Sequence, residues 1–233
     1  MKRYAINKLI EWKNKTKHKP LIIRGARQVG KTWLMKEFGK TEYKKTIYIN
    51  FELEKLMCDL FSLDFDTRRI IEGLELAYSK IDAKNTLIIL DEIQECPKAL
   101  TALKYFYENS PEYNIVAAGS LLGVAIHENI SFPVGKVDFL DLYPLSFLEF
   151  LEAIGENNFV KLLKSPTSPN LKIFKEKYID WLKKYYYIGG MPEVVSVFVE
   201  TNDFKKVRKI QENILDAYTK DFSKHISLNI LRL

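Results

Sequence analysis

The chain has 233 residues, of which 47% are hydrophobic, so it can build one α/β domain of ordinary size and a smaller helical part, each with its own core. This composition excludes a disordered chain, and no stretch approaches the roughly 20 apolar residues of a membrane-spanning helix. Formal net charge is +6, from 36 Lys and Arg against 30 Asp and Glu, which is a mild excess compared with a dedicated nucleic-acid binder.

The N-terminus and the cysteines bear on the compartment. Met1–Leu9 lacks the apolar segment of a secretory signal, which predicts a cytoplasmic protein with no membrane contact. Cys58 and Cys96 have no His or Cys neighbours at metal-ligand spacing, so two reduced thiols are expected. The densest basic run, Lys13–Lys19, is either the solvated end of an N-terminal helix or a contact to a phosphate backbone.

Short β-type runs alternate with segments of helical period along the first part of the chain. Such alternation predicts an α/β fold, in which a five-stranded parallel sheet is flanked by helices on both faces. The predicted strands are Pro20–Arg24, Thr46–Phe51, Thr86–Leu90, Asn114–Ala118 and Val137–Leu142. The predicted helices between them are Lys31–Phe38, Thr67–Lys80 and Lys98–Glu108.

The strand signal stops after Leu142, and a smaller all-helical part is expected from about Pro144. Lys164–Asn170 carries two prolines and two serines and so predicts a loop. The expected domains are 1–143 for the α/β part, 144–202 for a helical region and 203–233 for a helix that begins a further domain. The predicted helices are Leu145–Ala153, Ile173–Tyr187, Pro192–Glu200 and Phe204–Phe222.

The first strand runs directly into the octamer GARQVGKT, which fits G-x-x-x-x-G-K-[ST] between a strand and a helix. Its glycines allow the backbone to curl so that amide groups face the α- and β-phosphates of a nucleotide. Lys31 is expected to reach the β- and γ-phosphates, and the Thr32 hydroxyl is expected to bind Mg²⁺. The residues predicted to bind the nucleotide are Gly25, Ala26, Arg27, Gln28, Val29, Gly30, Lys31, Thr32 and Trp33.

Two carboxylates end the apolar run LIIL of another predicted strand. Asp91 at the strand end is expected to hold Mg²⁺ together with Thr32. Glu92 beside it is expected to activate the attacking water as a general base. Because a P-loop kinase needs no water-activating glutamate at this place, the Asp-Glu pair favours hydrolysis, and Lys31 and Glu92 are predicted to be catalytic.

Two polar residues at the ends of other predicted strands each have two possible roles. Ser120 follows the strand Asn114–Ala118, and it either contacts the γ-phosphate or the water, as a catalytic residue, or caps the next helix. Asn50 ends the second strand, and it either restrains Glu92 or closes a turn.

At this point the sequence resembles the AAA+-type bacterial and archaeal P-loop ATPases in which an ATPase domain precedes a C-terminal domain of unknown function. The resemblance covers most of the chain, and several of the matching stretches are not required for nucleotide binding in general. The matching stretches are Pro20–Thr32, Leu87–Pro97, Ala118–Gly123, Ser131–Lys136, Tyr143–Leu151, Gly189–Val194 and Asp221–His225.

The resemblance implies an AAA+-like sheet with the P-loop strand at its centre, followed by a helical lid, with ATP and Mg²⁺ as cofactors. It also implies that the chain stops near the start of the family's C-terminal domain. Gly189–Pro192 either ends one helix and starts the next, or acts as a lid hinge that responds to the nucleotide. The resemblance leaves open a homo-oligomer, because no arginine has a context typical of an arginine finger.

The sequence thus predicts an ATPase that uses hydrolysis to drive conformational change on a macromolecular partner, either nucleic acid or another protein. Two alternatives remain at this point. One is a nucleotide-gated switch that binds ATP or ADP with little hydrolysis, and the other is a nucleic-acid-binding module that carries a P-loop.

Overall fold

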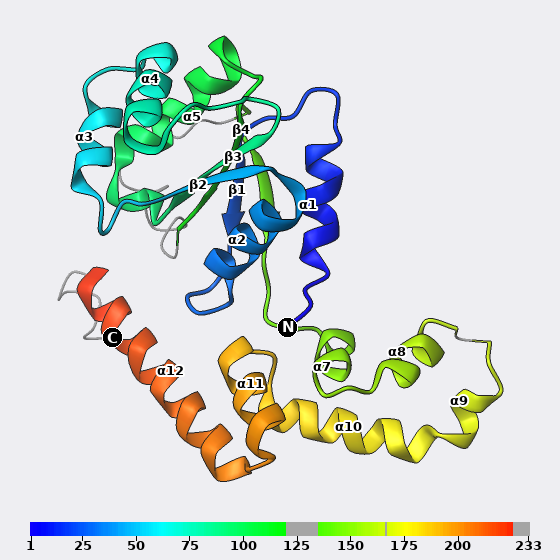
Figure 1. The fold of residues 1–233 in the computed structure, drawn as a ribbon. Coiled ribbons are helices and arrows are strands. Elements are labelled where there is room, and N and C mark those ends of the chain that lie inside the picture. Colours follow the sequence, from blue (N-terminus) through cyan, green and yellow to red (C-terminus); the bar gives the residue numbers. More distant parts are fainter. Residues whose placement is uncertain (120–134, 166, 226–233) are drawn as a thin grey trace. The chain divides into compact units, whose positions relative to one another are not determined.

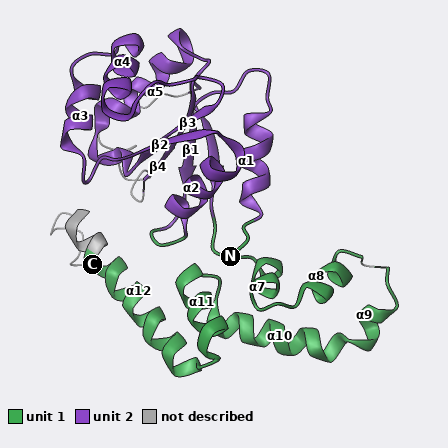
Figure 2. Cartoon of the chain, viewed as in Figure 1, with its two compact units in different colours: residues 1–3, 27–29, 143–233 green, residues 4–26, 30–142 purple. Residues whose placement is uncertain are grey.

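The computed structural model describes the backbone of residues 1–119, 135–165 and 167–225, and the side chains as far as residue 220. The chain forms two compact units (Figure 1, Figure 2). The sheet unit contains residues 4–26 and 30–142, and the helical unit contains residues 1–3, 27–29 and 143–233. The middle of the predicted P-loop, Arg27–Val29, therefore belongs to the helical unit, and the rest of that loop belongs to the sheet unit.

The sheet unit is built on five parallel strands in the order β2-β3-β4-β1-β5. All five predicted strands are present, each within one residue of the expected bounds. The P-loop strand β1 is an internal strand, paired with β4 on one side and β5 on the other. The strands are β1 (Leu21–Arg24), β2 (Lys45–Asn50), β3 (Thr86–Asp91), β4 (Asn114–Ala118) and β5 (Asp138–Asp141).

Helices cover both faces of this sheet, as a parallel sheet requires (Figure 1). Helix α2 packs on β2, β3 and β4, and α1 packs on α2. The other face carries α3, α4 and α5. The helices of the sheet unit are α1 (Ala5–Lys13), α2 (Lys31–Glu42), α3 (Lys55–Ser62), α4 (Thr67–Tyr78) and α5 (Pro97–Asn109), with the short 3-10 helix η1 (Ile93–Glu95) before α5.

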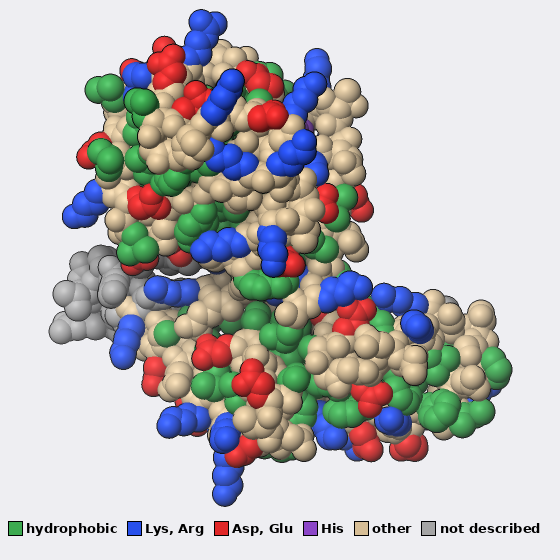
Figure 3. Space-filling view, in the orientation of Figure 1, with side chains coloured by type: hydrophobic (Ala, Val, Ile, Leu, Met, Phe, Trp, Pro, Cys, Tyr) green, Lys and Arg blue, Asp and Glu red, His purple; other side chains and the backbone are tan. Residues whose placement is uncertain are grey.

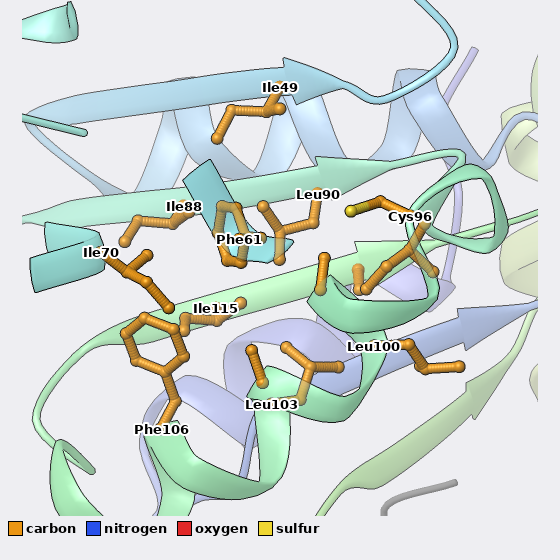
Figure 4. Close-up of a cluster of buried hydrophobic side chains, with 14 of the residues drawn as sticks. Ile49, Phe61, Ile70, Ile88, Leu90, Cys96, Leu100, Leu103, Phe106 and Ile115 are labelled. Carbon is orange, nitrogen blue, oxygen red and sulfur yellow. The ribbon is translucent and has the colours of Figure 1, made fainter. Parts of the chain in front are cut away.

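The core under α3, α4 and α5 consists of alternate strand residues and the apolar faces of the three helices (Figure 4). Ile88 and Leu90 of β3 contribute to it with Phe106 of α5, and each is at most 1% exposed. Every residue of β3 is buried, so this strand is fixed on both faces. Its last residue, Asp91, is thereby held rigidly at the carboxyl edge of the sheet.

The helical unit has its own core, in which Phe150, Val195 and Phe198 are among the buried residues. The predicted helices after Leu142 are present. Two further helices, α8 and α9, were not predicted, because 7 and 4 residues are too few to show a helical period. The helices of this unit are α7 (Phe147–Ala153), α8 (Asn157–Leu163), α9 (Asn170–Ile173), α10 (Lys175–Ile188), α11 (Pro192–Thr201) and α12 (Phe204–His225).

The cysteines differ from the sequence prediction. Cys58 in α3 and Cys96 before α5 form a disulfide, with Cα atoms 5.6 Å apart, and the prediction of two reduced thiols is wrong. The two residues are 38 positions apart and follow no spacing pattern, so only the packing of α3 beside α5 could bring them together.

Gly190 has a packing role. A Cβ atom at this position would lie 2.2 Å from the carbonyl oxygen of Leu145, and Leu145 donates its N–H to the Gly190 carbonyl at 2.6 Å. Gly189 before it ends α10 with φ 76° and ψ −173°, a backbone conformation that essentially only glycine adopts. The pair thus ends α10 and admits the Leu145 backbone, whereas its role as a hinge stays a prediction.

Basic and acidic side chains are interspersed over the face of the molecule drawn in Figure 3. The mild basic excess is not gathered into one patch on that face. Within the described part of the chain, no helix is both long and apolar enough to cross a membrane.

Candidate nucleotide-binding site

The octamer Gly25–Thr32 lies between β1 and α2, as the sequence predicted. Gln28 and Gly30 both have positive φ values, 64° and 96°, so the loop turns twice through left-handed backbone. Gly30 caps α2 from this conformation, which glycine adopts at low cost. A loop with this backbone conformation can turn successive N–H groups to one concave side, which is the arrangement that binds phosphate oxygens.

Lys31 lies inside this curl. Its side chain is only 7% exposed, and Nζ donates to the carbonyl oxygens of Gly25 and Ala26 at 2.9 Å each. A buried ammonium is costly unless acceptors surround it. The structure therefore places a fixed positive charge in the loop where an anion would bind.

Thr32 and Asp91 come together from α2 and β3. Thr32 Oγ1 donates to Asp91 Oδ2 at 2.7 Å, and Asp91 is only 2% exposed. A hydroxyl and a carboxylate are the oxygen ligands that suit Mg²⁺, which takes few protein ligands and keeps several waters. The donor set therefore fits the cation that a bound nucleoside triphosphate carries.

Tyr48 of β2 joins the same carboxylate, which the sequence analysis did not foresee. Its hydroxyl donates to Asp91 Oδ2 at 2.9 Å. Burial and the neighbouring Asp91 carboxylate raise the pKa of Tyr48 well above its usual value, so the hydroxyl keeps its proton. The side chain lies outside every motif, and only the pairing of β2 with β3 brings it here.

Glu92 follows Asp91 in left-handed backbone, with φ 49° and ψ 46°. A non-glycine residue in this region is uncommon and is found disproportionately at functional sites. Its carboxylate oxygen Oε2 accepts a hydrogen bond from Gln94 Nε2 at 2.7 Å. Gln94 is a second residue that the sequence analysis missed, because a glutamine two positions after Glu92 belongs to no general motif.

Three other residues that the sequence singled out are Trp33, Asn50 and Ser120. Trp33 lies in the first turn of α2 and is 43% exposed. Asn50 pairs in register with Asp91, and its side-chain oxygen accepts the Glu52 N–H at 3.0 Å, so it closes a turn at the end of β2. Ser120 lies outside the described residues, and its two readings stay predictions.

A separate apolar cavity of about 430 Å³ lies between α3 and α4, away from these residues. Leucine side chains are prominent in its lining, including Leu56 and Leu60 of α3 and Leu76 of α4. Because it offers few polar groups, it does not suit a charged nucleotide.

Comparison with known families agrees with this geometry. The AAA domain family matches residues 17–151, which is more than half of the chain and contains Gly25–Thr32, Asp91 and Glu92. The chain belongs to the AAA domain family. Residues 179–232 match a second family, described as a domain of unknown function. The family resemblance that was noted from the sequence is confirmed, and membership of this family supports ATP binding.

Solved structures support the fold. A Walker-type ATPase of Pyrococcus abyssi matches 96% of this chain and 75% of its own length, with a TM-score of 0.59 at 16% identity. A STAND-type signal transduction ATPase with a tetratricopeptide repeat sensor, from Pyrococcus horikoshii, matches 90% of this chain and 32% of its own length, with a TM-score of 0.48 at 15% identity. Only the first is similar enough to support the AAA-like fold. The search of curated proteins returned no match.

Proposed function

We propose that the chain binds ATP with Mg²⁺ and hydrolyses it. The observation that carries this proposal is the approach of Thr32 Oγ1 to Asp91 Oδ2, 2.7 Å apart, next to a P-loop whose curl contains the buried Lys31 ammonium. Phosphate-binding backbone, a cationic side chain and a hard oxygen pair are the three parts that phosphoryl transfer from a Mg²⁺-bound nucleotide requires.

Each residue has a defined role in this proposal. The amide groups of Gly25–Thr32 bind the α- and β-phosphates, and Lys31 exchanges its contacts with the Gly25 and Ala26 carbonyls for phosphate oxygens. Thr32 and Asp91 would hold Mg²⁺, which would supply positive charge next to the phosphate oxygens. Trp33, in the first turn of α2, belongs to the same proposed set of nucleotide-binding residues.

Glu92 supplies the base for hydrolysis. It accepts a proton from water while the water oxygen bonds to the γ-phosphorus and the bond from that phosphorus to the bridging oxygen breaks, leaving ADP and phosphate. Its left-handed backbone and its bond to Gln94 fix the direction of the carboxylate. Ser120 remains a candidate contact for the γ-phosphate or the water.

The wider function stays a proposal that rests on the sequence. We infer that the hydrolysis cycle drives conformational change on a nucleic-acid or protein partner in the cytoplasm. The division into 1–143, a lid at 144–202 and 203–233 belongs to the same proposal, as does a homo-oligomer.

Steady-state phosphate release tests the proposal. Wild type, Lys31→Ala and Glu92→Gln are compared at saturating Mg²⁺, with ATP affinity measured in parallel. Lys31→Ala is expected to weaken ATP binding, because it removes the charge inside the loop. Glu92→Gln is expected to keep ATP affinity and to lower turnover by about 100-fold or more, as loss of a general base does.

A nucleotide-gated switch is the second candidate, and the Glu92–Gln94 hydrogen bond favours it. The hydrogen bond from Gln94 Nε2 occupies Glu92 Oε2, so that oxygen is held toward Gln94 and is not free to accept a proton from water. Under this reading the wild type binds ATP with little turnover, and Gln94→Ala raises the rate by releasing Glu92. Under the hydrolase reading Gln94→Ala lowers the rate, because Glu92 loses its orientation.

A further inference from the structure

The guanidinium of Arg3 is buried in the helical unit, with only 5% of the residue exposed. Its Nε lies 3.2 Å from Glu149 Oε1, its Nη1 donates to the Val29 carbonyl at 2.9 Å, and its Nη2 donates to the Tyr143 carbonyl. A buried arginine is stable only when its donors are paired in good geometry, and its planar fork holds several acceptors at once. Arg3 therefore fixes the position of each group that it contacts.

Glu149 is itself held in place by the start of α7. Its Oε2 accepts the Ser146 N–H at 2.8 Å, and its own N–H donates to Ser146 Oγ at 3.3 Å, which forms a capping box. The two carboxylate oxygens thus have different partners, Arg3 and the helix cap. This gives a physical role to the stretch Tyr143–Leu151, which nucleotide binding in general does not require.

Tyr218 of α12 holds a second P-loop carbonyl. Its hydroxyl donates to the Arg27 carbonyl oxygen at 2.6 Å. Lys31 holds two further carbonyl groups. Side chains thus hold four carbonyl groups of the loop, those of Gly25, Ala26, Arg27 and Val29.

The direction of a carbonyl sets the direction of the next amide. In a planar trans peptide the C=O and the following N–H point in opposite directions. When Arg3 holds the Val29 carbonyl, the Gly30 N–H is turned to the other side, and Tyr218 does the same for the Gln28 N–H through Arg27. Gln28 and Gly30 are the two left-handed residues of the loop, so side-chain contacts hold the peptides that its curl depends on.

We propose that Arg3 and Tyr218 are positioning residues of the nucleotide site, which hold the P-loop peptides so that their amides are aimed at the phosphates. The proposal rests on the proposed ATP-binding function. Arg3, Tyr218 and the two carbonyls that they hold belong to the same compact unit, and both side chains lie outside the octamer. In this proposal neither side chain contacts the nucleotide or the reacting atoms.

The milder test is Tyr218→Phe, which removes one hydroxyl. Affinity for ATP and ADP, measured by titration calorimetry, is expected to fall by about threefold to tenfold, which is the effect of one hydrogen bond. In turnover, KM rises by the same factor and kcat stays constant, whereas a general loss of folding would lower the active fraction without this split. Tyr186→Phe is the matched control, because that side chain is 76% exposed, and it is expected to bind as wild type does.

Arg3 is tested with Arg3→Lys, which keeps a cation beside Glu149 but loses the fork that holds the Val29 and Tyr143 carbonyls. The melting temperature is expected to fall, and ATP affinity, measured below the unfolding transition, is expected to fall by about tenfold. Arg208→Met is the control, since that guanidinium pairs with Glu212 on an exposed face. Wild-type affinity in both Tyr218→Phe and Arg3→Lys would overturn the positioning role, whereas a wild type that fails to bind ATP would instead overturn the proposed function.

Discussion

The hydroxyl of Tyr48 and the hydroxyl of Thr32 donate to the same carboxylate oxygen of Asp91, at 2.9 Å and 2.7 Å. Tyr48 comes from β2 and Thr32 from α2, so Asp91 is fixed from two directions. Outer partners of a metal-holding carboxylate set its orientation and its affinity for the cation. Tyr48 should therefore tune the Mg²⁺ dependence of the proposed reaction.

Tyr48→Phe is predicted to raise the Mg²⁺ concentration for half-maximal ATP turnover by about tenfold, within the range for loss of an outer-shell partner. Nucleotide affinity without Mg²⁺ should stay the same, because the P-loop is untouched. Tyr43→Phe is the control, since its hydroxyl bonds Asn114 instead. An unchanged Mg²⁺ titration in Tyr48→Phe would contradict the prediction.

Gly190→Ala is predicted to lower the free energy of unfolding by about 1–3 kcal/mol, the usual cost of overpacking. The added Cβ would lie 2.2 Å from the Leu145 carbonyl oxygen, and backbone atoms yield less readily than side chains. Gly189→Ala meets no atom within 4 Å, but φ 76° with ψ −173° is a backbone conformation that essentially only glycine adopts, so it should also cost about 1–3 kcal/mol. Urea unfolding measures both variants, and wild-type stability in Gly190→Ala would argue against the close packing of Gly190.

The Cys58–Cys96 disulfide closes a loop of 38 residues along the chain. Its loss is predicted to reduce the free energy of unfolding by up to about 4 kcal/mol, from the entropy of the unfolded loop. Thermal unfolding with and without dithiothreitol measures this, and the double variant C58S/C96S should no longer respond to the reductant. Two free thiols in the denatured, unreduced protein would show that the bond does not form.

His18 should make stability depend on pH. Burial lowers its pKa, and hydrogen bonds with the Lys15 backbone and the Asn114 side chain oppose this effect, as does the Asp138 charge. The ring packs edge-on against Trp12, with ring centroids 4.6 Å apart. As the pH falls, the unfolded state takes up a proton on His18 at a higher pH than the folded state does. The contribution of His18 to the free energy of unfolding is therefore complete above the unfolded pKa of about 6.5 and is lost as the pH falls below it. Urea unfolding between pH 7.5 and pH 5 should have a shallower pH slope in His18→Phe, and an identical slope would exclude His18 as the cause.

The sequence alone determined the parts of this protein that depend on local pattern. The sequence predicted the five strand segments, the octamer between β1 and α2, and the two carboxylates at the end of β3. Each of these is a short local pattern that is typical of one structure. The parallel pairing followed from the alternation of strands and helices. Short helices such as α3 were missed, since eight residues show too little period to distinguish them from a loop.

Only the tertiary structure decided which distant side chains serve the loop and its carboxylates. Tyr48 reaches Asp91 through strand pairing, and Arg3 and Tyr218 reach P-loop carbonyls from opposite ends of the chain. Cys58 met Cys96 for the same reason, through the packing of two helices. None of these contacts could be predicted from the spacing of residues along the chain. A hydrogen bond or a disulfide depends on the distance between two groups in space, and the packing of the core sets that distance.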